Sequence, residues 1–413
     1  MTLKIAFRNI FRQKRRTILT ALAMIVGFTL SSVFIGWADG AYSSIINMFT
    51  QNRIGHIQVH RKGYLDKPSL YDTIDDYESV GVTIQSVKGV EAWTPRLYSA
   101  GLGSVGEKST AVQIIGIDPV REVAATRFDK KVTTGKGFSK EPRLHRNSKQ
   151  PAREALIGKG LAKILKATIG QEIVLVSQGA DGSIANDLYT IIGIAESGDE
   201  TTDRMACYLP IEEAQELLVL EGRIHEIVVI VSHLNEVNKI TKAIQMKLGD
   251  SHLDVAPWQE VAKSFYRAMK ADRQGDLISR IVIMLIVAIG VLNTVLMSVL
   301  ERTREYGVLK AIGTKPRQIF WLVMCEVNII ALFSIIVGAL LGVFINYLLS
   351  IYGVTLPQAF TWGGMEFRTM YGEVNARSLY IPAITVIVAA TVVALFPALK
   401  AARIAPAKAM RTH

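Results

Sequence analysis

Residues 277–300 read LISRIVIMLIVAIGVLNTVLMSVL, and residues 301–319, which follow directly, read ERTREYGVLKAIGTKPRQI. About 20 helical residues cross the hydrocarbon core of a membrane, so the first stretch predicts a transmembrane helix. Residues 301–317 hold five basic and two acidic residues. Because short basic segments beside spans stay in the cytoplasm, the second stretch is predicted to lie inside.

Three further stretches repeat this pattern of an apolar run beside a basic segment. Excess positive charge is confined to 1–17 (+6), 301–317 (+3) and 400–413 (+4), which leaves −2 on the remaining chain. A nucleic-acid-binding protein would place this charge on a folded domain, so nucleic acid is not expected as a partner. Both termini are predicted to be cytoplasmic. The apolar runs are Ile18–Ala38, Ile319–Ile351 and Leu379–Leu399.

The first run could instead belong to a signal peptide, since Ala38-Asp39-Gly40 resembles a cleavage site. The apolar region of such a peptide has about 7–15 residues, so the longer run favours a retained anchor. Mean hydropathy is +0.28. The chain is nevertheless 20% charged, which favours a membrane protein with a large water-exposed part.

We therefore expect a membrane domain of four transmembrane helices, with a large α/β extracytoplasmic domain inserted between helices 1 and 2. The predicted segments are a cytoplasmic basic segment (1–17), helix 1 (18–38), extracytoplasmic stalks and core domain (39–276), helix 2 (277–300), a cytoplasmic helix (301–318), helix 3 (319–351), an extracytoplasmic loop (352–378), helix 4 (379–399) and a cytoplasmic tail (400–413).

Within 39–276, helical spacing of apolar residues predicts stalk helices at 41–55 and 256–275. Between the stalks, stretches rich in Val, Ile and Tyr predict strands. A basic, Pro-containing loop is expected at 136–153. The predicted strands are 54–60, 111–117, 172–177, 188–194 and 224–232, and the predicted helices are 159–166, 211–220 and 235–248.

Several motifs come close to known chemistry without completing it. Gly101–Thr110 resembles a phosphate-binding loop, but Glu107 stands where that loop needs Lys, so a Gly-rich hairpin is favoured. His225-Glu226 lacks the second His of a zinc-protease signature. His56 and His60 would lie about 13 Å apart on a strand, too far to share a metal. We expect no catalytic residue, no metal site and no cofactor bound by this chain.

Two features lie inside the predicted spans. Glu326 is either a functional charge within the membrane or, as we favour, a carboxylate near the cytoplasmic interface that pairs with Arg or Lys. Small residues recur every four positions in helices 1 and 3, and such faces permit close helix packing. They include Gly27, Ser31, Ser334, Gly338 and Gly342.

The segment 301–319 predicts a short amphipathic helix with Tyr306, Leu309 and Ile312 on one side. Gly313 is a predicted helix stop, and Pro316 suits the first turn of the next helix. A helix this short is marginal in isolation, so it needs a surface on which to dock. We expect a cytoplasmic partner to supply that surface.

The stretches Glu301–Gly313, Phe396–Arg411 and Ala6–Arg12 resemble the coupling-helix, C-terminal and N-terminal motifs of FtsX-like ABC transporter permeases. Ile115–Pro119, Ala155–Ala162 and Tyr189–Gly198 resemble the MacB-like periplasmic core domain. Trp258-Gln259 before a stalk resembles the lipoprotein-releasing (LolC/LolE-type) permeases most closely.

The resemblance implies a non-catalytic permease in a bacterial inner membrane, working as a homodimer or heterodimer with a second permease chain. A separate cytoplasmic ABC ATPase would bind ATP and Mg, and a periplasmic lipoprotein carrier or adaptor is a further expected partner, beside membrane lipids. Phe49 and Phe265 are expected to line a substrate vestibule between two chains. The implied ATPase interface comprises Glu301, Arg304, Glu305, Tyr306, Gly307, Leu309, Lys310, Ile312 and Gly313.

The implied function is lipoprotein or amphiphile extraction by an ATP-driven motion. The alternatives are efflux of drugs, toxins or peptides through an adaptor and outer-membrane channel, or regulation of a periplasmic cell-wall hydrolase.

Overall fold

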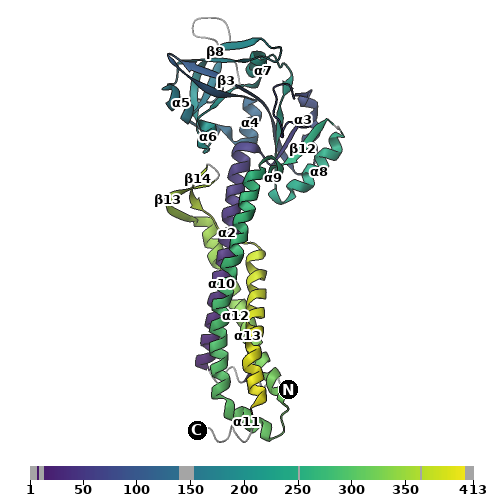
Figure 1. Ribbon diagram of the computed structural model, residues 1–413, viewed down its shortest axis with the longest axis vertical. Coiled ribbons are helices and arrows are strands. Elements are labelled where there is room, and N and C mark those ends of the chain that lie inside the picture. Colours follow the sequence, from purple (N-terminus) through teal and green to yellow (C-terminus); the bar gives the residue numbers. More distant parts are fainter. Residues whose placement is uncertain (1–6, 9–13, 139–152, 250–251, 363–364, 405–413) are drawn as a thin grey trace. The chain divides into compact units, whose positions relative to one another are not determined.

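A computed structural model describes residues 7–8, 14–138, 153–249, 252–362 and 365–404 (Figure 1). Most of the predicted N-terminal motif, the 136–153 loop and the tail beyond Ile404 lie outside the described residues. The chain forms two compact units. The helical unit comprises residues 1–44, 269–357 and 368–413, and the α/β unit comprises residues 45–268 and 358–367.

The helical unit contains a helix at each of the four predicted spans. All four are long and apolar enough to cross a membrane. Each extends beyond its apolar run, because a helix ends at a backbone stop signal rather than where hydrophobicity falls. Pro316 begins α12 and Gly353, at φ 62°, ends it. The helices are α2 (Lys14–Phe49), α10 (Lys263–Glu301), α12 (Pro316–Tyr352) and α13 (Arg377–Arg403).

Small residues bring α12 against α2. A Cβ atom on Gly338 would lie 2.9 Å from Phe28, so only glycine fits at this approach. Asn346 Nδ2 donates to the Ser32 carbonyl oxygen at 3.1 Å. The α2 face that meets α12 therefore runs through Phe28 and Ser32, one residue beyond the predicted stripe. The predicted packing residues Gly27, Ser31, Ser334, Gly338 and Gly342 are all buried.

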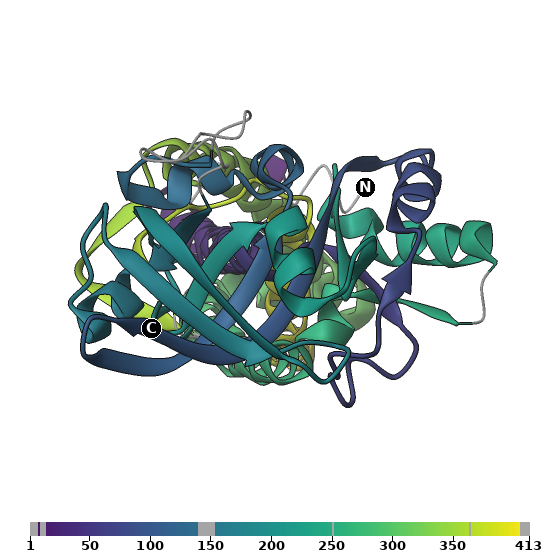
Figure 2. The ribbon, with the colours of Figure 1, turned by 90° about the horizontal axis from the view of Figure 1, so that it is seen from above.

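The α/β unit is built on one large mixed sheet (Figure 2). Its strand order is β12-β1-β11-β3-β4-β9-β6-β8-β5, and β7 pairs with both β3 and β8. The strands are β1 (Ile57–Arg61), β3 (Val90–Val105), β4 (Lys108–Ile117), β5 (Val132–Gly135), β6 (Glu154–Gly158), β7 (Glu172–Gln178), β8 (Ile184–Ala195), β9 (Ala206–Pro210), β11 (Glu226–Val231) and β12 (Leu253–Pro257). Two small sheets pair β2 (Ile74–Asp75) with β10 (Arg223–Ile224) and β13 (Val354–Trp362) with β14 (Met365–Met370).

The 16-residue strand β3 organises this sheet because its two halves have different neighbours. Residues 90–96 pair with β11, and residues 102–104 pair with β7. Through β4, β9, β6, β8 and β7 the pairing returns to β3, which closes a barrel around one apolar core. That core includes Ile114, Ile157, Leu175, Tyr189 and the free Cys207.

Helices cover the sheet where the chain leaves its strands. α4 (Pro119–Thr126) follows β4 directly, and the Asp118 side chain caps it by accepting the N–H groups of Val120 and Arg121. α3 (Tyr77–Gln85) and α8 (Val237–Leu248) lie side by side at the β12 end (Figure 1). The predicted helices at 159–166 and 211–220 are α5 (Lys159–Leu165) and α7 (Ile211–Leu218).

Two predicted elements in this unit differ from those observed. Residues 54–56 do not belong to a strand, because α2 leads into a π-helical turn at Thr50–Ile54 and β1 starts only at Ile57. Ala256 and Pro257 end β12 rather than starting the second stalk, since they pair with β1. A short helix α9 (Trp258–Val261) then precedes α10. The predicted Gly-rich hairpin is confirmed as the β3–β4 turn at Gly106.

Candidate functional site

The predicted amphipathic helix between spans 2 and 3 is α11 (Thr303–Ala311). Its end follows from Gly313, which adopts φ 98°. The Gly313 N–H donates to the Lys310 carbonyl and the Thr314 N–H to the Leu309 carbonyl, the pattern of a Schellman motif. Gly313 is therefore confirmed as the helix stop, and the chain turns sharply into α12.

α11 is tied to the rest of the helical unit by buried and polar contacts. Tyr306 is only 1% exposed and belongs to the helical core. Lys310 Nζ donates to the carbonyl oxygens of Ala402 and Ile404 at 2.9 and 2.8 Å, which satisfies acceptors left open at the end of α13. The position of α11 is thus set largely by its own chain.

An ion pair adds a second link, between α11 and α12. Arg302 Nη1 donates to both carboxylate oxygens of Glu326, at 3.1 and 2.9 Å. Arg302 Nε also donates to Glu305 at 3.0 Å. Glu326 is therefore paired with a cation of the basic loop, as the favoured interpretation predicts. The Arg302 side chain is 8% exposed, so this pair is shielded from water by the chain itself.

These contacts change the predicted docking face. Tyr306 and Gly307 are buried inside this chain, so they are not available to a partner, and Leu309 is half-buried against the same core. Helical spacing placed Tyr306, Leu309 and Ile312 on one side, but Ile312 lies past the last turn and is 75% exposed. Val308 is 46% exposed. Of the other predicted interface residues, Glu301, Arg304 and Gly313 are exposed, and Glu305 and Lys310 are half-buried.

The two residues predicted to line a vestibule contact each other instead. The rings of Phe49 and Phe265 stack with centroids 3.9 Å apart and planes 11° apart. Trp258 packs edge-on against Phe265. In this chain the two phenyl rings therefore cover one another rather than facing across an open space, because two apolar stripes leaving neighbouring helices bury each other first.

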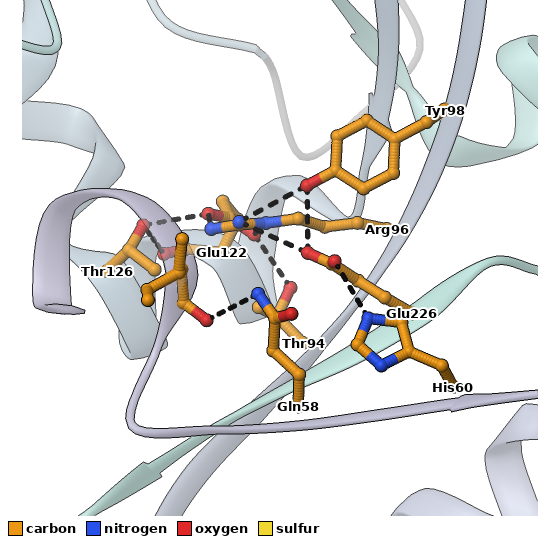
Figure 3. A network of polar contacts seen from close by, with 9 residues as sticks. Gln58, His60, Thr94, Arg96, Tyr98, Glu122, Thr126 and Glu226 are labelled. Atoms are coloured by element: carbon orange, nitrogen blue, oxygen red, sulfur yellow. Dashed lines mark hydrogen bonds and ion pairs between the residues drawn. The ribbon is translucent and has the colours of Figure 1, made fainter. Parts of the chain in front are cut away.

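A second polar centre lies in the α/β unit and was not predicted (Figure 3). Arg96 of β3 donates to Glu122 of α4 through Nη2 at 2.6 Å and through Nε at 3.2 Å. Glu226 of β11 accepts from the Tyr98 hydroxyl at 2.8 Å and contacts His60 Nε2 at 3.4 Å. Arg96 Nη1 also contacts Glu226 at 3.5 Å. The network is charged although Arg96, Glu122, Glu226 and His60 are all buried; Tyr98 is half-buried.

Pairing determines the ionisation of this network. Burial alone would raise the pKa of Glu122, but the adjacent Arg96 guanidinium holds it below its ordinary value. Burial likewise opposes ionisation of Glu226, whose pKa is nevertheless lowered by the His60 hydrogen bond and the Arg96 charge. Lys131 lies at the edge of the network, and burial lowers its pKa to about 8. Both carboxylates are therefore ionised at neutral pH.

The histidines of the sequence motifs stabilise the sheet by hydrogen bonding to its backbone. His56 Nδ1 accepts the Val231 N–H at 2.9 Å, and burial lowers the pKa of His56 to about 4. His225 Nδ1 accepts the Tyr98 N–H at 3.0 Å. Among the described residues no group of three His, Cys, Asp or Glu side chains is placed to hold a metal ion. The only sequence signal for the network was the presence of charged residues inside apolar strands.

Comparison with known proteins gives a family match for each of the two parts of the chain. Residues 17–247 match the MacB-like periplasmic core domain, and residues 278–406 match the FtsX-like permease C-terminal domain. An uncharacterised ABC transporter permease of Methanocaldococcus jannaschii is 25% identical over 82% of this chain and 82% of its own length. The lipoprotein-releasing system transmembrane protein LolC of Neisseria meningitidis is 19% identical over 83% of this chain and 81% of its own length.

Two MacB proteins are also similar. The macrolide export ATP-binding/permease protein MacB of Nitrobacter winogradskyi is 24% identical over 87% of this chain, which spans 56% of the length of that relative. The solved periplasmic region of MacB from Actinobacillus actinomycetemcomitans is 16% identical, with a TM-score of 0.35 over 51% of this chain and 93% of that one. The family matches together cover most of the described residues, and the chain belongs to the FtsX-like permeases that carry a MacB-like periplasmic core domain.

Proposed function

We propose that this chain is the permease subunit of an ABC transporter, and that α11 couples it to a separate cytoplasmic ATPase. The observation that carries this proposal is the construction of α11: Tyr306, Lys310 and the Arg302–Glu326 pair hold it, while Val308 and Ile312 expose apolar surface at its end. A helix that is anchored on one side and apolar at its exposed end is suited to transmit a conformational change from a bound partner to α12 and α13.

The proposed work is extraction of a lipoprotein or another amphiphile from the inner membrane by motion of the extracytoplasmic α/β unit. Support comes from similarity to LolC over most of both chains. Similarity to MacB favours a second candidate, efflux with an adaptor and outer-membrane channel. A wall-hydrolase regulator is less favoured, because such regulators are expected to have a smaller domain than residues 45–268 form here.

The proposal requires that the α/β unit and α11 lie on opposite sides of the membrane. Ser183 is exposed in the α/β unit and Lys315 is exposed just after α11. In intact cells, a membrane-impermeant thiol reagent should label Ser183→Cys and leave Lys315→Cys unlabelled until the cells are opened. Equal labelling of both sites in intact cells would contradict this topology.

The coupling role is tested at Ile312. Burying a large aliphatic side chain contributes about 1.5–3 kcal/mol, so Ile312→Asp should weaken ATPase binding by roughly tenfold or more. We expect loss of co-purification with the cognate ATPase and loss of substrate-stimulated ATP hydrolysis by the assembled complex. The matched control is Met246→Asp, which places the same charge on another exposed apolar helix position, 79% exposed on α8.

The control should leave assembly and hydrolysis unchanged. If Ile312→Asp also left both at the wild-type level, α11 would not be the coupling helix. Leu309→Asp is a less specific probe, since it would place a charge against this chain's own core.

A further inference from the structure

The loop 371–376 leads from β14 to α13, and its backbone is hydrogen-bonded to two other helices. The Glu373 N–H donates to the Gly36 carbonyl oxygen of α2 at 2.9 Å. The Gly372 N–H donates to the Leu349 carbonyl oxygen of α12 at 3.1 Å. These residues all belong to the helical unit. The loop therefore connects α2, α12 and the start of α13.

A glycine on α2 makes room for this loop. A Cβ atom on Gly40 would collide with the Tyr371 carbonyl oxygen and would lie 2.6 Å from the Gly372 carbonyl carbon. Both neighbours are backbone atoms, so they cannot rotate away as the tip of a side chain can. Gly40 is itself buried. The backbone of the loop therefore packs directly on the backbone of α2.

Asp39 of α2 receives side-chain contacts from the start of α13. Its Oδ1 atom accepts from Arg377 Nη1 at 3.0 Å, and its Oδ2 atom accepts from Asn375 Nδ2 at 3.0 Å. Asn375 Oδ1 in turn accepts the Ser378 N–H at 2.8 Å, in the first turn of α13. Arg273 of α10 approaches the same carboxylate at 3.9 Å. The Asp39 side chain is 13% exposed, so little water competes for these charge-assisted hydrogen bonds.

These three residues, Asp39, Asn375 and Arg377, form what we call the clasp. The clasp lies just before α2 passes from the helical unit into the α/β unit. α2 is one continuous helix as far as Phe49, and the α/β unit begins at Ile45. A displacement of α2 at the clasp therefore continues into the α/β unit through unbroken helix.

The opposite ends of α12 and α13 are the ones that contact α11. Arg302, just before α11, pairs with Glu326 of α12, and Lys310 of α11 donates to carbonyl oxygens at the end of α13. The packing of α12 on α2 is largely apolar, and apolar contacts are non-directional, so they permit sliding. Hydrogen bonds to a carboxylate instead fix the position of α13 along α2.

We propose that the clasp transmits the displacement of α12 and α13 to α2, and that Asp39 is the positioning residue that makes these helices move together. Without this carboxylate, the start of α13 can shift along α2 and the α/β unit does not follow. The proposal rests on the proposed function, because it requires α11 to be displaced by an ATPase.

The test uses the full-length chain assembled with its cognate ATPase in phosphatidylcholine nanodiscs. Hydrogen–deuterium exchange is measured with and without Mg²⁺ and a non-hydrolysable ATP analogue. In the wild type, the analogue should change the exchange of peptides covering residues 303–311 and also of peptides covering residues 41–49. In Asp39→Asn, which keeps the side-chain shape, the first response should remain and the second should be lost.

The comparison of the two responses separates transmission from folding. A variant that no longer folds or assembles loses both responses together, whereas a variant without the clasp loses only the response at residues 41–49. The matched control is Asp272→Asn, because Asp272 accepts from the Tyr42 hydroxyl at 2.7 Å and so links α10, rather than α13, to α2. This control should keep both responses.

Three results would overturn the clasp proposal alone, while the response at residues 303–311 is present. One is a wild type without a response at residues 41–49, another is a wild-type response there in Asp39→Asn, and the third is its loss in Asp272→Asn as well. If Asp39→Asn does not assemble, Arg377→Gln decides, since Arg377 is 39% exposed and its replacement leaves Asn375 in place. A wild-type response at residues 41–49 in Arg377→Gln would then overturn the proposal. A wild type without any response at residues 303–311 would contradict the proposed function as well.

Discussion

Replacing Glu326 by Gln should loosen α11 without unfolding the chain. The substitution keeps the side-chain shape and removes the charge that Arg302 Nη1 contacts at 3.1 and 2.9 Å. Arg302 would retain Glu305, whose side chain is 40% exposed and so pairs in a more aqueous environment. A guanidinium that is 8% exposed would then lack its buried counter-ion.

The expected cost follows from these contacts. A hydrogen bond to a charged group contributes about 1.5–3 kcal/mol net, and leaving a buried charge unpaired costs more. Because Gln can still accept one hydrogen bond and Glu305 remains, we expect about 1.5–3 kcal/mol of local destabilisation. Since 1.4 kcal/mol is a factor of ten, amide protection in α11 should fall roughly 10- to 100-fold.

Hydrogen–deuterium exchange of the detergent-solubilised chain measures this directly. Peptides covering α11 report the effect, and peptides covering α3 in the α/β unit serve as an internal reference that should not change. The matched control is Glu305→Gln, which removes the more solvent-accessible partner of the same arginine, a side chain that is 40% exposed. An ion pair whose carboxylate is well hydrated contributes about 0–1 kcal/mol, so this control should lower protection less than about fivefold.

The reasoning would be refuted if Glu326→Gln left α11 protection within twofold of the wild type. It would equally be refuted if Glu305→Gln had the larger effect. Either result would mean that Tyr306 and the Lys310 contacts with the end of α13 hold α11 without help from the ion pair.

Two further predictions concern packing and pH. Gly338→Leu should lower the thermal unfolding midpoint, because a larger side chain disrupts the close approach to Phe28 at a cost of about 1–3 kcal/mol. The control Gly290→Ala should have little effect, since its Cβ would lie 3.7 Å from the nearest side chain. Equal unfolding midpoints for the two variants would contradict this packing. The pKa of His56 in the folded chain is about 4, below the reference value of 6.5. Between these two pH values the unfolded chain therefore binds more protons than the folded chain. The free energy of unfolding consequently falls as the pH falls from 6.5 through 4. Denaturant titrations at pH 7 and pH 4 measure the decrease in unfolding free energy between these pH values. This decrease should be about 3 kcal/mol smaller in His56→Gln than in the wild type. An equal decrease in both proteins would contradict the lowered pKa of His56.

Local sequence was sufficient for several elements because their causes are local. Apolar runs longer than the hydrocarbon core produce the four long helices. Gly313 ends α11 because glycine readily adopts positive φ, and Pro316 begins α12 because its missing N–H costs nothing in a first helical turn. The hairpin at Gly106 follows from the same backbone preference. The predicted side of the membrane on which each loop lies stays a prediction.

Tertiary structure alone determined which face of each element is covered. Helical periodicity grouped Tyr306 with Ile312, but only the packed bundle shows that Tyr306 is 1% exposed and Ile312 75% exposed. The Arg96 network joins residues 26 and 130 positions apart, so no local pattern could reveal it. Periodicity specifies that a side chain must be buried or paired, whereas the partner is chosen by strand register and helix packing between distant parts of the chain.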